Sequence, residues 1–280
     1  MAKARTSAQR RQQRATNRPR FLAVDFFCGA GGTTRGLIDA GGYVIAGVDK
    51  DERCKDTFLG NNANSTGDCA PPAFLHRDIF RRQPDYPQGE NRQLTADLDE
   101  LIISHSRKMR GVPLLFAICA PCQPFTRLSK KELSSERRLG REKDSNLLRE
   151  AATFVSRYQP EMVLSENVAG IKDAKYGGVW EAFRRRLELL GYATGTKVVC
   201  TSRFGIPQYR KRSILVAVRR ELARPDRFAD MLSTELVVPE ADNDQSIKTV
   251  IDAIAHLPRI VAGEMHARVP EPPCADPQRT

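Results

Sequence analysis

Two cysteines three positions apart, Cys119 and Cys122, are the residues whose type and spacing first suggest chemistry. Such a pair can be a thiol–disulfide redox pair, half of a zinc site, or one nucleophilic thiolate beside an unrelated cysteine. The other cysteines and the four histidines are scattered singly, which disfavours a metal site because zinc needs four ligands. Pro121 and Pro124 disfavour the helix that usually begins inside a redox motif, and they favour an extended loop that presents one thiol. The spacing alone does not decide between a redox pair and a nucleophile.

A glycine-rich turn follows the apolar run at residues 21–27. Glycines there let the backbone approach a ligand closely, and the next helix, which Thr33 or Thr34 could cap, offers N–H donors at its N-terminus. The next apolar run ends at Asp49, where a carboxylate can accept hydrogen bonds from ribose hydroxyls. Sites for NAD, FAD and S-adenosylmethionine share this arrangement, and a tight turn without a ligand is the alternative. The turn therefore predicts a nucleoside-containing cofactor without identifying it.

These residues need a scaffold, and the chain alternates between strand and helix patterns. Strands are expected at 21–27, 43–48, 74–76, 112–120, 162–165, 196–200 and 213–218. Helices are expected through 37–40 and at 52–61, 96–109, 145–158, 179–190 and 248–256. This alternation predicts an α/β fold with a doubly wound, mostly parallel sheet, in which ligands bind at the carboxyl ends of the strands.

The composition of the 280 residues, 40% hydrophobic and 28% charged, is that of an ordinary soluble globular protein. No apolar run is long enough to cross a membrane, no signal peptide is recognised, and the odd number of seven cysteines disfavours a disulfide framework, so a cytoplasmic location is expected. The net charge of +11 concerns partners rather than fold. Residues 1–20 hold no acidic residue and are expected to form a disordered basic arm that suits nucleic acid, with a solubilising tail as an equal alternative.

Four separated segments together resemble the S-adenosylmethionine-dependent C5-cytosine DNA methyltransferases of bacterial type. They are Asp25-Phe-Phe-Cys-Gly-Ala-Gly-Gly32, Pro121-Cys-Gln-Pro-Phe-Thr126, Glu166-Asn-Val168 and Gln208-Tyr-Arg-Lys-Arg212. In order, they are similar to the family's cofactor loop, nucleophile loop, acidic motif and paired-arginine motif. The resemblance implies a Rossmann-like class I methyltransferase fold and a double-stranded DNA substrate with a flipped cytosine.

The resemblance also implies a role for each catalytic residue. Cys122 would add to C6 of cytosine as a thiolate, because C5 is a poor nucleophile until the ring becomes enamine-like. Glu166 would bind the N3 edge and the exocyclic amine, supply or share a proton, and benefit from a raised pKa. Arg212 would hold the cytosine O2, and Arg210 would help to order the site.

For the cofactor, S-adenosylmethionine, the resemblance implies contacts at both ends of the molecule, and no metal is implied. The expected residues are Phe27 and Asp78 at the adenine, Asp49 at the ribose, Gly29, Ala30, Gly31 and Gly32 around the methionine end, and Pro121 and Leu147 along the pocket wall. Asp78 could instead be a surface turn acid.

The sequence departs from the family after the paired-arginine motif, because the family's last two cofactor motifs do not occur in it. The expected organisation is a basic arm at 1–20, a cofactor-binding and catalytic domain at 21–223, and the start of a target recognition region or an irregular tail at 224–280. Three explanations fit this departure: a split enzyme whose second polypeptide carries the remainder, a truncated gene product, or an unusual minimal enzyme, and we favour the first two. A restriction–modification setting with nucleoid association is expected, and a tRNA cytosine-C5 methyltransferase or a noncatalytic subunit is the alternative.

Overall fold

The computed structural model describes residues 18–121, 146–172, 178–222 and 248–257. Cys122 and nearly all of the basic arm lie outside these ranges. The described strands are β1 (Leu22–Phe26), β2 (Tyr43–Asp49), β3 (Ala73–His76), β4 (Leu114–Ile118), β5 (Met162–Val168), β6 (Tyr192–Cys200) and β7 (Lys211–Arg219). The described helices are α2 (Gly32–Asp39), α3 (Lys55–Asn61), α4 (Asn91–Lys108), α6 (Leu147–Tyr158), α7 (Val179–Leu189) and α9 (Val250–Ile254), with short 3₁₀ turns η1 (Glu52–Cys54), η3 (Ala169–Lys172) and η5 (Thr201–Phe204).

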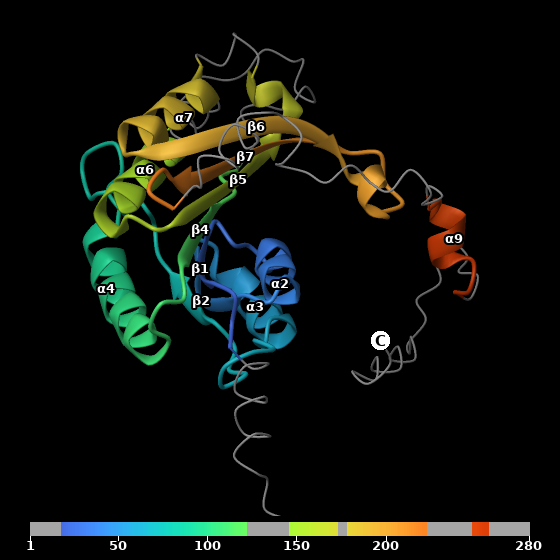
Figure 1. Cartoon of the computed structure of the whole chain (residues 1–280), viewed down its shortest axis with the longest axis horizontal. Helices are drawn as coiled ribbons and strands as arrows, with labels where there is room; N and C mark the ends of the chain where they lie inside the picture. Colours follow the sequence, from blue (N-terminus) through green and yellow to red (C-terminus); the bar gives the residue numbers. More distant parts are fainter. Residues whose placement is uncertain (1–17, 122–145, 173–177, 223–247, 258–280) are drawn as a thin grey trace, which may run out of the picture.

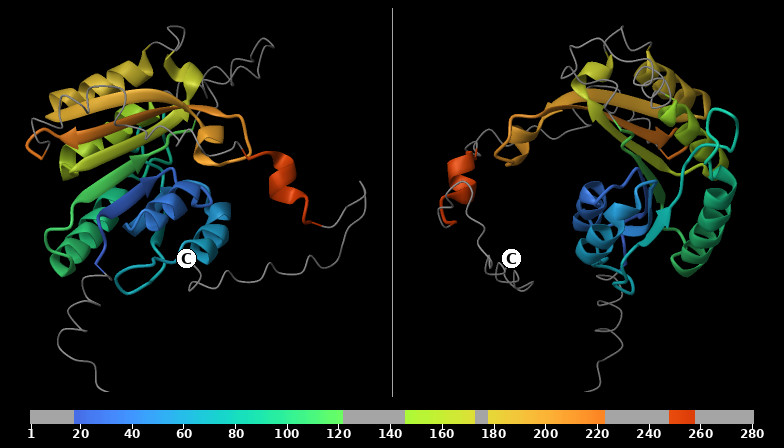
Figure 2. Two further views of the ribbon diagram at one scale, coloured as in Figure 1. Left: turned by 45° about the vertical axis from the view of Figure 1, so that its right-hand side comes forward. Right: turned by 180° about the vertical axis from the view of Figure 1, so that it is seen from behind.

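The strands form one seven-stranded sheet in the order β3-β2-β1-β4-β5-β7-β6 (Figure 1). The pairs from β3 to β5 are parallel, while β7 is antiparallel to both β5 and β6. The prediction of a doubly wound, mostly parallel sheet is therefore confirmed. Parallel strands require crossover connections, and these carry helices to both faces of the sheet (Figure 2).

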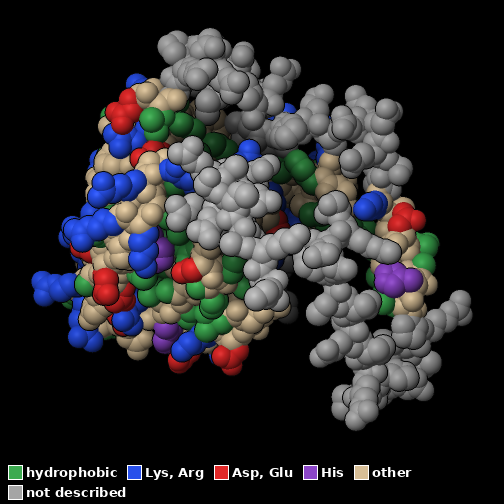
Figure 3. Space-filling view, turned by 60° about the horizontal axis from the view of Figure 1, so that its bottom comes forward, with side chains coloured by type: hydrophobic (Ala, Val, Ile, Leu, Met, Phe, Trp, Pro, Cys, Tyr) green, Lys and Arg blue, Asp and Glu red, His purple; other side chains and the backbone are tan. Residues whose placement is uncertain are grey.

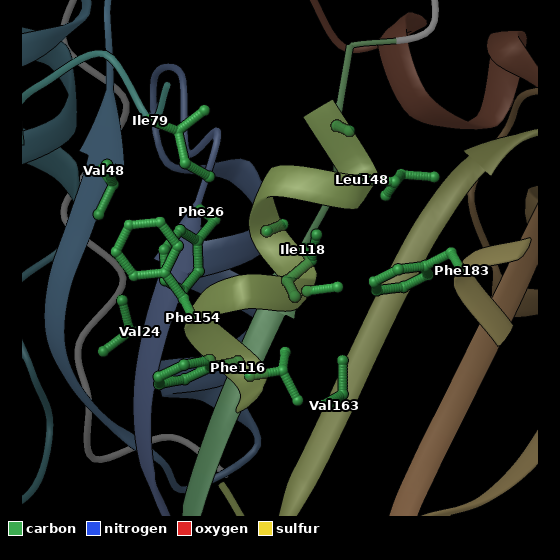
Figure 4. Packing of buried hydrophobic residues seen from close by; sticks show 14 of the residues in the cluster. Val24, Phe26, Val48, Ile79, Phe116, Ile118, Leu148, Phe154, Val163 and Phe183 are labelled. Atoms are coloured by element: carbon green, nitrogen blue, oxygen red, sulfur yellow. The ribbon is translucent and has the colours of Figure 1, made fainter. Parts of the chain in front are cut away.

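The larger core lies between the sheet and helices α4, α6 and α7. Figure 4 shows Phe26, Phe116 and Val163 of adjacent strands packed against Phe154 of α6, with Phe183 of α7 beside them. The phenyl rings of Phe26 and Phe116 meet edge to face with their centroids 5.1 Å apart. The helix expected at 179–190 is observed as α7, and its Phe183 and Leu187 are buried in this core.

The opposite face of the sheet has a smaller core, where Leu37 and Ile38 of α2 pack against β1, β2 and β4. The same face continues across β5 and β7, where Leu164 is paired with Val216 and Glu166 with Ile214. These four side chains are only half-buried. In the described ranges α2 and α3 lie over β1 to β3, so this part of the face carries no helix of its own (Figures 1 and 2).

Several element boundaries differ from the sequence expectations. Helix α4 begins earlier than expected, at Asn91. Strand β5 continues through Val168 because its antiparallel pairing with β7 extends that far, and β6 begins at Tyr192 for the same reason. Neither Thr33 nor Thr34 caps α2: the cap residue is Gly31, in the left-handed conformation, and no side chain caps the helix. The expectation that a threonine caps this helix was wrong, because the buried Thr34 hydroxyl donates its hydrogen bond to Asp25 instead.

None of the helices in the described ranges is both long enough and apolar enough to cross a membrane.

Candidate functional site

The glycine loop crosses the carboxyl ends of β1 and β2 with three residues in the left-handed region. Phe27, Gly29 and Gly31 have φ angles of +62°, +51° and +92°. A Cβ atom on Gly31 would stand 2.1 Å from Nδ2 of Asn62, so this position admits only glycine. The same Asn62 amide donates hydrogen bonds to the Phe58 and Ala30 carbonyls at 2.8 Å and 3.4 Å. The loop is therefore held against the end of α3.

Asp49, the last residue of β2, fixes the loop from the other side. Its Oδ2 accepts a hydrogen bond from the Gly29 N–H at 2.8 Å, and its Oδ1 accepts one from the Asp51 N–H at 2.9 Å. Each carboxylate oxygen has two lone pairs, so both oxygens can still accept from a ligand hydroxyl. Asp49 can thus position the loop and bind a ribose at the same time.

A partly open pocket lies beside this loop at the carboxyl ends of β1 and β2. It brings together five residues that the sequence predicted for cofactor binding: Phe27, Asp49, Asp78, Pro121 and Leu147. These residues come from the ends of β1 and β2, the segment after β3, the end of β4 and the start of α6. The geometry suits an adenosine group, with an aromatic wall and carboxylates at its edge.

Asp78 lies in this pocket rather than on a surface turn, and it is itself held in position. Its Oδ1 accepts from the Phe80 N–H at 2.9 Å, and its own N–H donates to Glu90 at 3.1 Å. Sequence reasoning missed Lys50 and Arg77, which also line the pocket. Their position next to Asp49 and Asp78 in the chain was the signal that could have identified them.

Glu166 and Arg212 form an ion pair on the face of β5 and β7 that no helix of the described ranges covers, which we call the half-open face. The Arg212 Nε lies 2.6 Å from Glu166 Oε1, and the Arg212 side chain is 15% exposed while that of Glu166 is 37% exposed. The pair forms because Val168 and Arg212 are opposite each other in the β5–β7 ladder, so Glu166 and Arg212 lie on the same face two positions apart. Arg210 is exposed and precedes β7.

Burial is the main influence on the pKa of Glu166 and raises it, while the charge of Arg210 works in the opposite direction. The ion pair with Arg212 favours the ionised form and therefore opposes the effect of burial. A carboxyl group whose pKa is raised by burial is suited to a role in proton transfer.

The strand β5 also holds the segment that leads to the predicted nucleophile, a feature that sequence reasoning missed. The Ser165 hydroxyl donates to the Ile118 carbonyl at 2.6 Å, and the Asn167 amide donates to the Ala120 carbonyl at 3.1 Å. The backbone just before Pro121 is thereby tied to the strand that carries Glu166. Cys122 itself lies outside the described residues.

Cys119 follows β4 directly and is a half-buried residue with a weak thiol contact. Its Sγ accepts a hydrogen bond from the Thr33 hydroxyl at 3.8 Å. Burial is the largest cause that raises the pKa of Cys119, to about 12. Its sulfur is therefore a protonated thiol near neutral pH and a poor nucleophile.

Asp25 is a fully buried carboxyl group beneath the N-terminus of α2. Its Oδ2 accepts from the Thr34 hydroxyl at 2.7 Å, and its Oδ1 has no hydrogen-bond partner in the described part of the chain. Burial raises its pKa to about 7, and the hydrogen bonds from Thr34 offset only part of this effect.

We predict that this carboxyl group makes stability depend on pH. Its pKa rises from 3.8 to about 7 on folding, so the folded state binds the proton more tightly and stability falls as pH increases between these values. The slope from one proton is up to about 1.4 kcal/mol per pH unit. Urea unfolding of the wild type and Asp25→Asn at several pH values should show that the variant lacks this slope. Parallel pH dependences for the two proteins would contradict the prediction.

The strand order and the pocket at the carboxyl ends of β1 and β2 define a Rossmann-like class I methyltransferase fold. A crystal structure of a proposed DNA modification methyltransferase encoded within an Escherichia coli prophage has this fold. It superposes with a TM-score of 0.57 at 21% identity, over 86% of this chain and 56% of that one.

The chain belongs to the C-5 cytosine-specific DNA methylase family, whose model matches residues 87–263. Type II methylase M.HgiDII of Herpetosiphon aurantiacus is 28% identical over 84% of this chain and 54% of its own length. Type II methyltransferase M1.HphI of Haemophilus parahaemolyticus is 27% identical over 86% of this chain and 54% of its own length. The chain thus spans about half the length of these curated relatives.

Proposed function

We propose that this chain transfers a methyl group from S-adenosylmethionine to C5 of cytosine in double-stranded DNA, through a covalent adduct of Cys122. The observation that carries the proposal is the ion pair between Glu166 and Arg212, because Glu166 lies on β5, the strand that also holds the backbone before Pro121. Family membership and the pocket that Phe27, Asp49 and Asp78 line support it.

In the proposed reaction the Cys122 thiolate adds its electron pair to C6 of a flipped cytosine, while Glu166 shares a proton with N3. Arg212 holds O2 and keeps the Glu166 side chain in place, and Arg210 orders the site. S-adenosylmethionine would supply an electrophilic methyl group, which C5 takes up as the carbon–sulfur bond of the cofactor breaks. Removal of the C5 proton then expels the thiolate and restores the aromatic ring.

The cofactor would lie along the pocket, with adenine against Phe27 and near Asp78, and with the ribose at Asp49. The backbone from Gly29 through Ala30 and Gly31 to Gly32 would surround the methionine end, while Pro121 and Leu147 form the wall. The assignments of Phe27, Asp49, Asp78, Pro121 and Leu147 rest on their positions around one pocket, whereas Gly29, Ala30, Gly31 and Gly32 are not among the residues that line it.

We predict that Asp49→Ala weakens S-adenosylmethionine binding by about 10- to 100-fold, the equivalent of one or more hydrogen bonds to a charged group. The variant loses both the ribose acceptor and the contact that holds Gly29. Isothermal titration calorimetry measures the effect. Asp39→Ala, which removes an exposed carboxylate from α2, is the matched control and should bind as the wild type does. Equal affinities for the wild type and Asp49→Ala would refute the assignment.

The reaction is tested by transfer of a tritiated methyl group to DNA and, separately, to tRNA. We expect label in DNA at C5 of cytosine. Label in tRNA alone would favour an RNA substrate, and the absence of transfer together with retained binding would favour a noncatalytic subunit.

We further propose that a second polypeptide carries a DNA recognition region and covers the half-open face of β5 and β7. Leu164, Ile214 and Val216 on this face are half-buried, so a covering partner would remove apolar surface from water. Co-expression with the adjacent reading frame should then raise methyl transfer and reduce aggregation. Full activity of the purified chain alone would contradict this proposal. A restriction–modification role at the nucleoid is the setting we propose for the pair.

A further inference from the structure

A group of four cations lies at the edge of the sheet opposite the candidate site. Arg18, Arg107, Lys108 and Arg110 line one pocket together with Gly67 and Met109. We call the pocket that these four cations line the basic pocket. Arg18 stands shortly before the first residue of β1, and Arg110 shortly before the first residue of β4, so the pocket lies at the amino ends of these parallel strands. The candidate site lies at their carboxyl ends.

Figure 3 turns the bottom of Figure 1 forward and shows Lys and Arg side chains gathered along the side where α4 lies. All four cations are exposed, and none of them forms an ion pair within the described ranges. A guanidinium nitrogen of Arg18 donates to the Arg110 carbonyl, which ties the two segments of the pocket together.

The carboxylate adjacent to this pocket already accepts hydrogen bonds from other groups of the protein. Asp68 follows Gly67, and its Oδ1 accepts from the Tyr43 hydroxyl at 2.8 Å and from the Ala70 N–H at 3.1 Å. These contacts lower the pKa of Asp68, with the backbone hydrogen bond from Ala70 the largest cause. Its carboxylate therefore stabilises the turn and leaves the four cations without a direct partner.

A favourable interaction with the dipole of α4 explains the positions of only two of these four cations. Arg107 and Lys108 are in the last turn of α4, where cations stabilise the exposed carbonyl groups. Arg18 and Arg110 lie outside the helix and are not needed for that purpose. Four unpaired cations that converge from two segments create a positive potential suited to a ligand with repeated negative charges.

We propose that the basic pocket binds the phosphodiester backbone of duplex DNA outside the target sequence. Three of its four cations are arginines, whose planar guanidinium groups match phosphate oxygens in a bidentate manner. Arg18 also continues a segment, residues 1–17, that contains five basic residues and no acidic one: Lys3, Arg5, Arg10, Arg11 and Arg14. The inference goes beyond the proposed methyl transfer and does not depend on it.

The part of the DNA that the basic pocket binds differs from the part that enters the candidate site. β1 has five residues, so the two edges are separated by about 16 Å along the strand direction, at a rise of about 3.3 Å per residue. Contacts of this kind carry no sequence information, but they raise affinity for any duplex and lengthen the residence of the protein on long DNA.

The test compares the full chain with two variants of equal charge. Arg107→Ala/Arg110→Ala removes two cations of the basic pocket, and Arg92→Ala/Arg186→Ala removes two exposed cations elsewhere, at the start of α4 and on α7. Fluorescence anisotropy measures the affinity of each protein for a duplex without the target sequence, across a range of salt concentrations. The loss of two phosphate contacts should reduce the slope of log affinity against log salt by about 1.8.

We expect the pocket variant to bind at least about tenfold more weakly at 0.1 M salt, and the control variant to stay close to the wild type. Arg107→Lys/Arg110→Lys should restore most of the slope because it restores the charge. Equal slopes for pocket and control variants would overturn the proposal, as would lost binding to anionic lipid vesicles with unchanged binding to DNA. Thermal unfolding of each variant establishes that it is folded.

A second readout separates this surface from the candidate site. If methyl transfer occurs, the pocket variant should methylate a short target duplex at the wild-type rate and long DNA more slowly. If the chain transfers no methyl group, the anisotropy experiment still decides whether the pocket binds DNA. Failure of the proposed reaction and failure of the DNA-binding surface are therefore distinguishable.

Discussion

Glu166→Gln is expected to lower the rate of methyl transfer by about 10²- to 10⁴-fold, the range typical of a lost general acid–base group. Glutamine preserves the shape of the side chain, but it cannot supply a proton to N3 or carry the charge that pairs with Arg212. Cofactor affinity should remain within about twofold of the wild type, because Glu166 is not among the residues that line the pocket. Single-turnover transfer to DNA and calorimetry with S-adenosylmethionine measure the two quantities.

The pH dependence of methyl transfer provides a second test of the role of Glu166. Burial raises the pKa of Glu166, so the group keeps its proton to a higher pH than an exposed glutamate would. Wild-type activity should decline as pH rises through that pKa, and the decline should disappear in Glu166→Gln. Arg212→Lys keeps the positive charge and should retain more activity than Arg212→Ala. A Glu166→Gln enzyme with wild-type rates would exclude Glu166 from proton transfer.

Cys122→Ala is expected to abolish methyl transfer, with a loss of more than about 10³-fold, whereas Cys119→Ala should stay close to the wild type. The contrast follows from the chemistry of the two thiols. Cys119 is held as a protonated thiol by burial and receives a hydrogen bond from Thr33. Cys122 is bracketed by two prolines and follows a backbone segment that Ser165 and Asn167 anchor.

DNA that contains 5-fluorocytosine tests the same assignment directly. Fluorine at C5 cannot leave as a proton does, so the proposed adduct at C6 should persist and be visible as a covalent protein–DNA complex. The wild type and Cys119→Ala should form this complex, and Cys122→Ser should not. An adduct that survives Cys122→Ser would show that another residue is the nucleophile.

Strands β1 and β4 were the most predictable elements because each is a short, nearly continuous apolar run. Every residue of both strands is buried, as such a run predicts. The ends of elements were less predictable. Strand β5 reaches Val168 only because β7 pairs with it in an antiparallel direction, and that partner is more than forty positions away in the chain.

The cap of α2 shows a second limit of sequence reasoning. Threonine is a good helix cap, so Thr34 was a reasonable candidate. In the structure Thr34 is buried and donates to Asp25, and the cap residue that precedes the helix is Gly31, whose left-handed conformation suits glycine. A buried carboxyl group nine positions away outweighed the local preference, because an unpaired acid in the core is costly.

The sequence by itself determined the fold class, the glycine loop and the order of the four family segments, since these depend on local patterns and residue types. Tertiary structure decided which residues meet. It brought Asp49 to the Gly29 amide, Glu166 to Arg212 and Asn167 to the backbone before Pro121. These contacts join segments 20 to 47 positions apart, and they arise from strand order and register. Local sequence does not specify that order, because it results from the packing of the whole sheet.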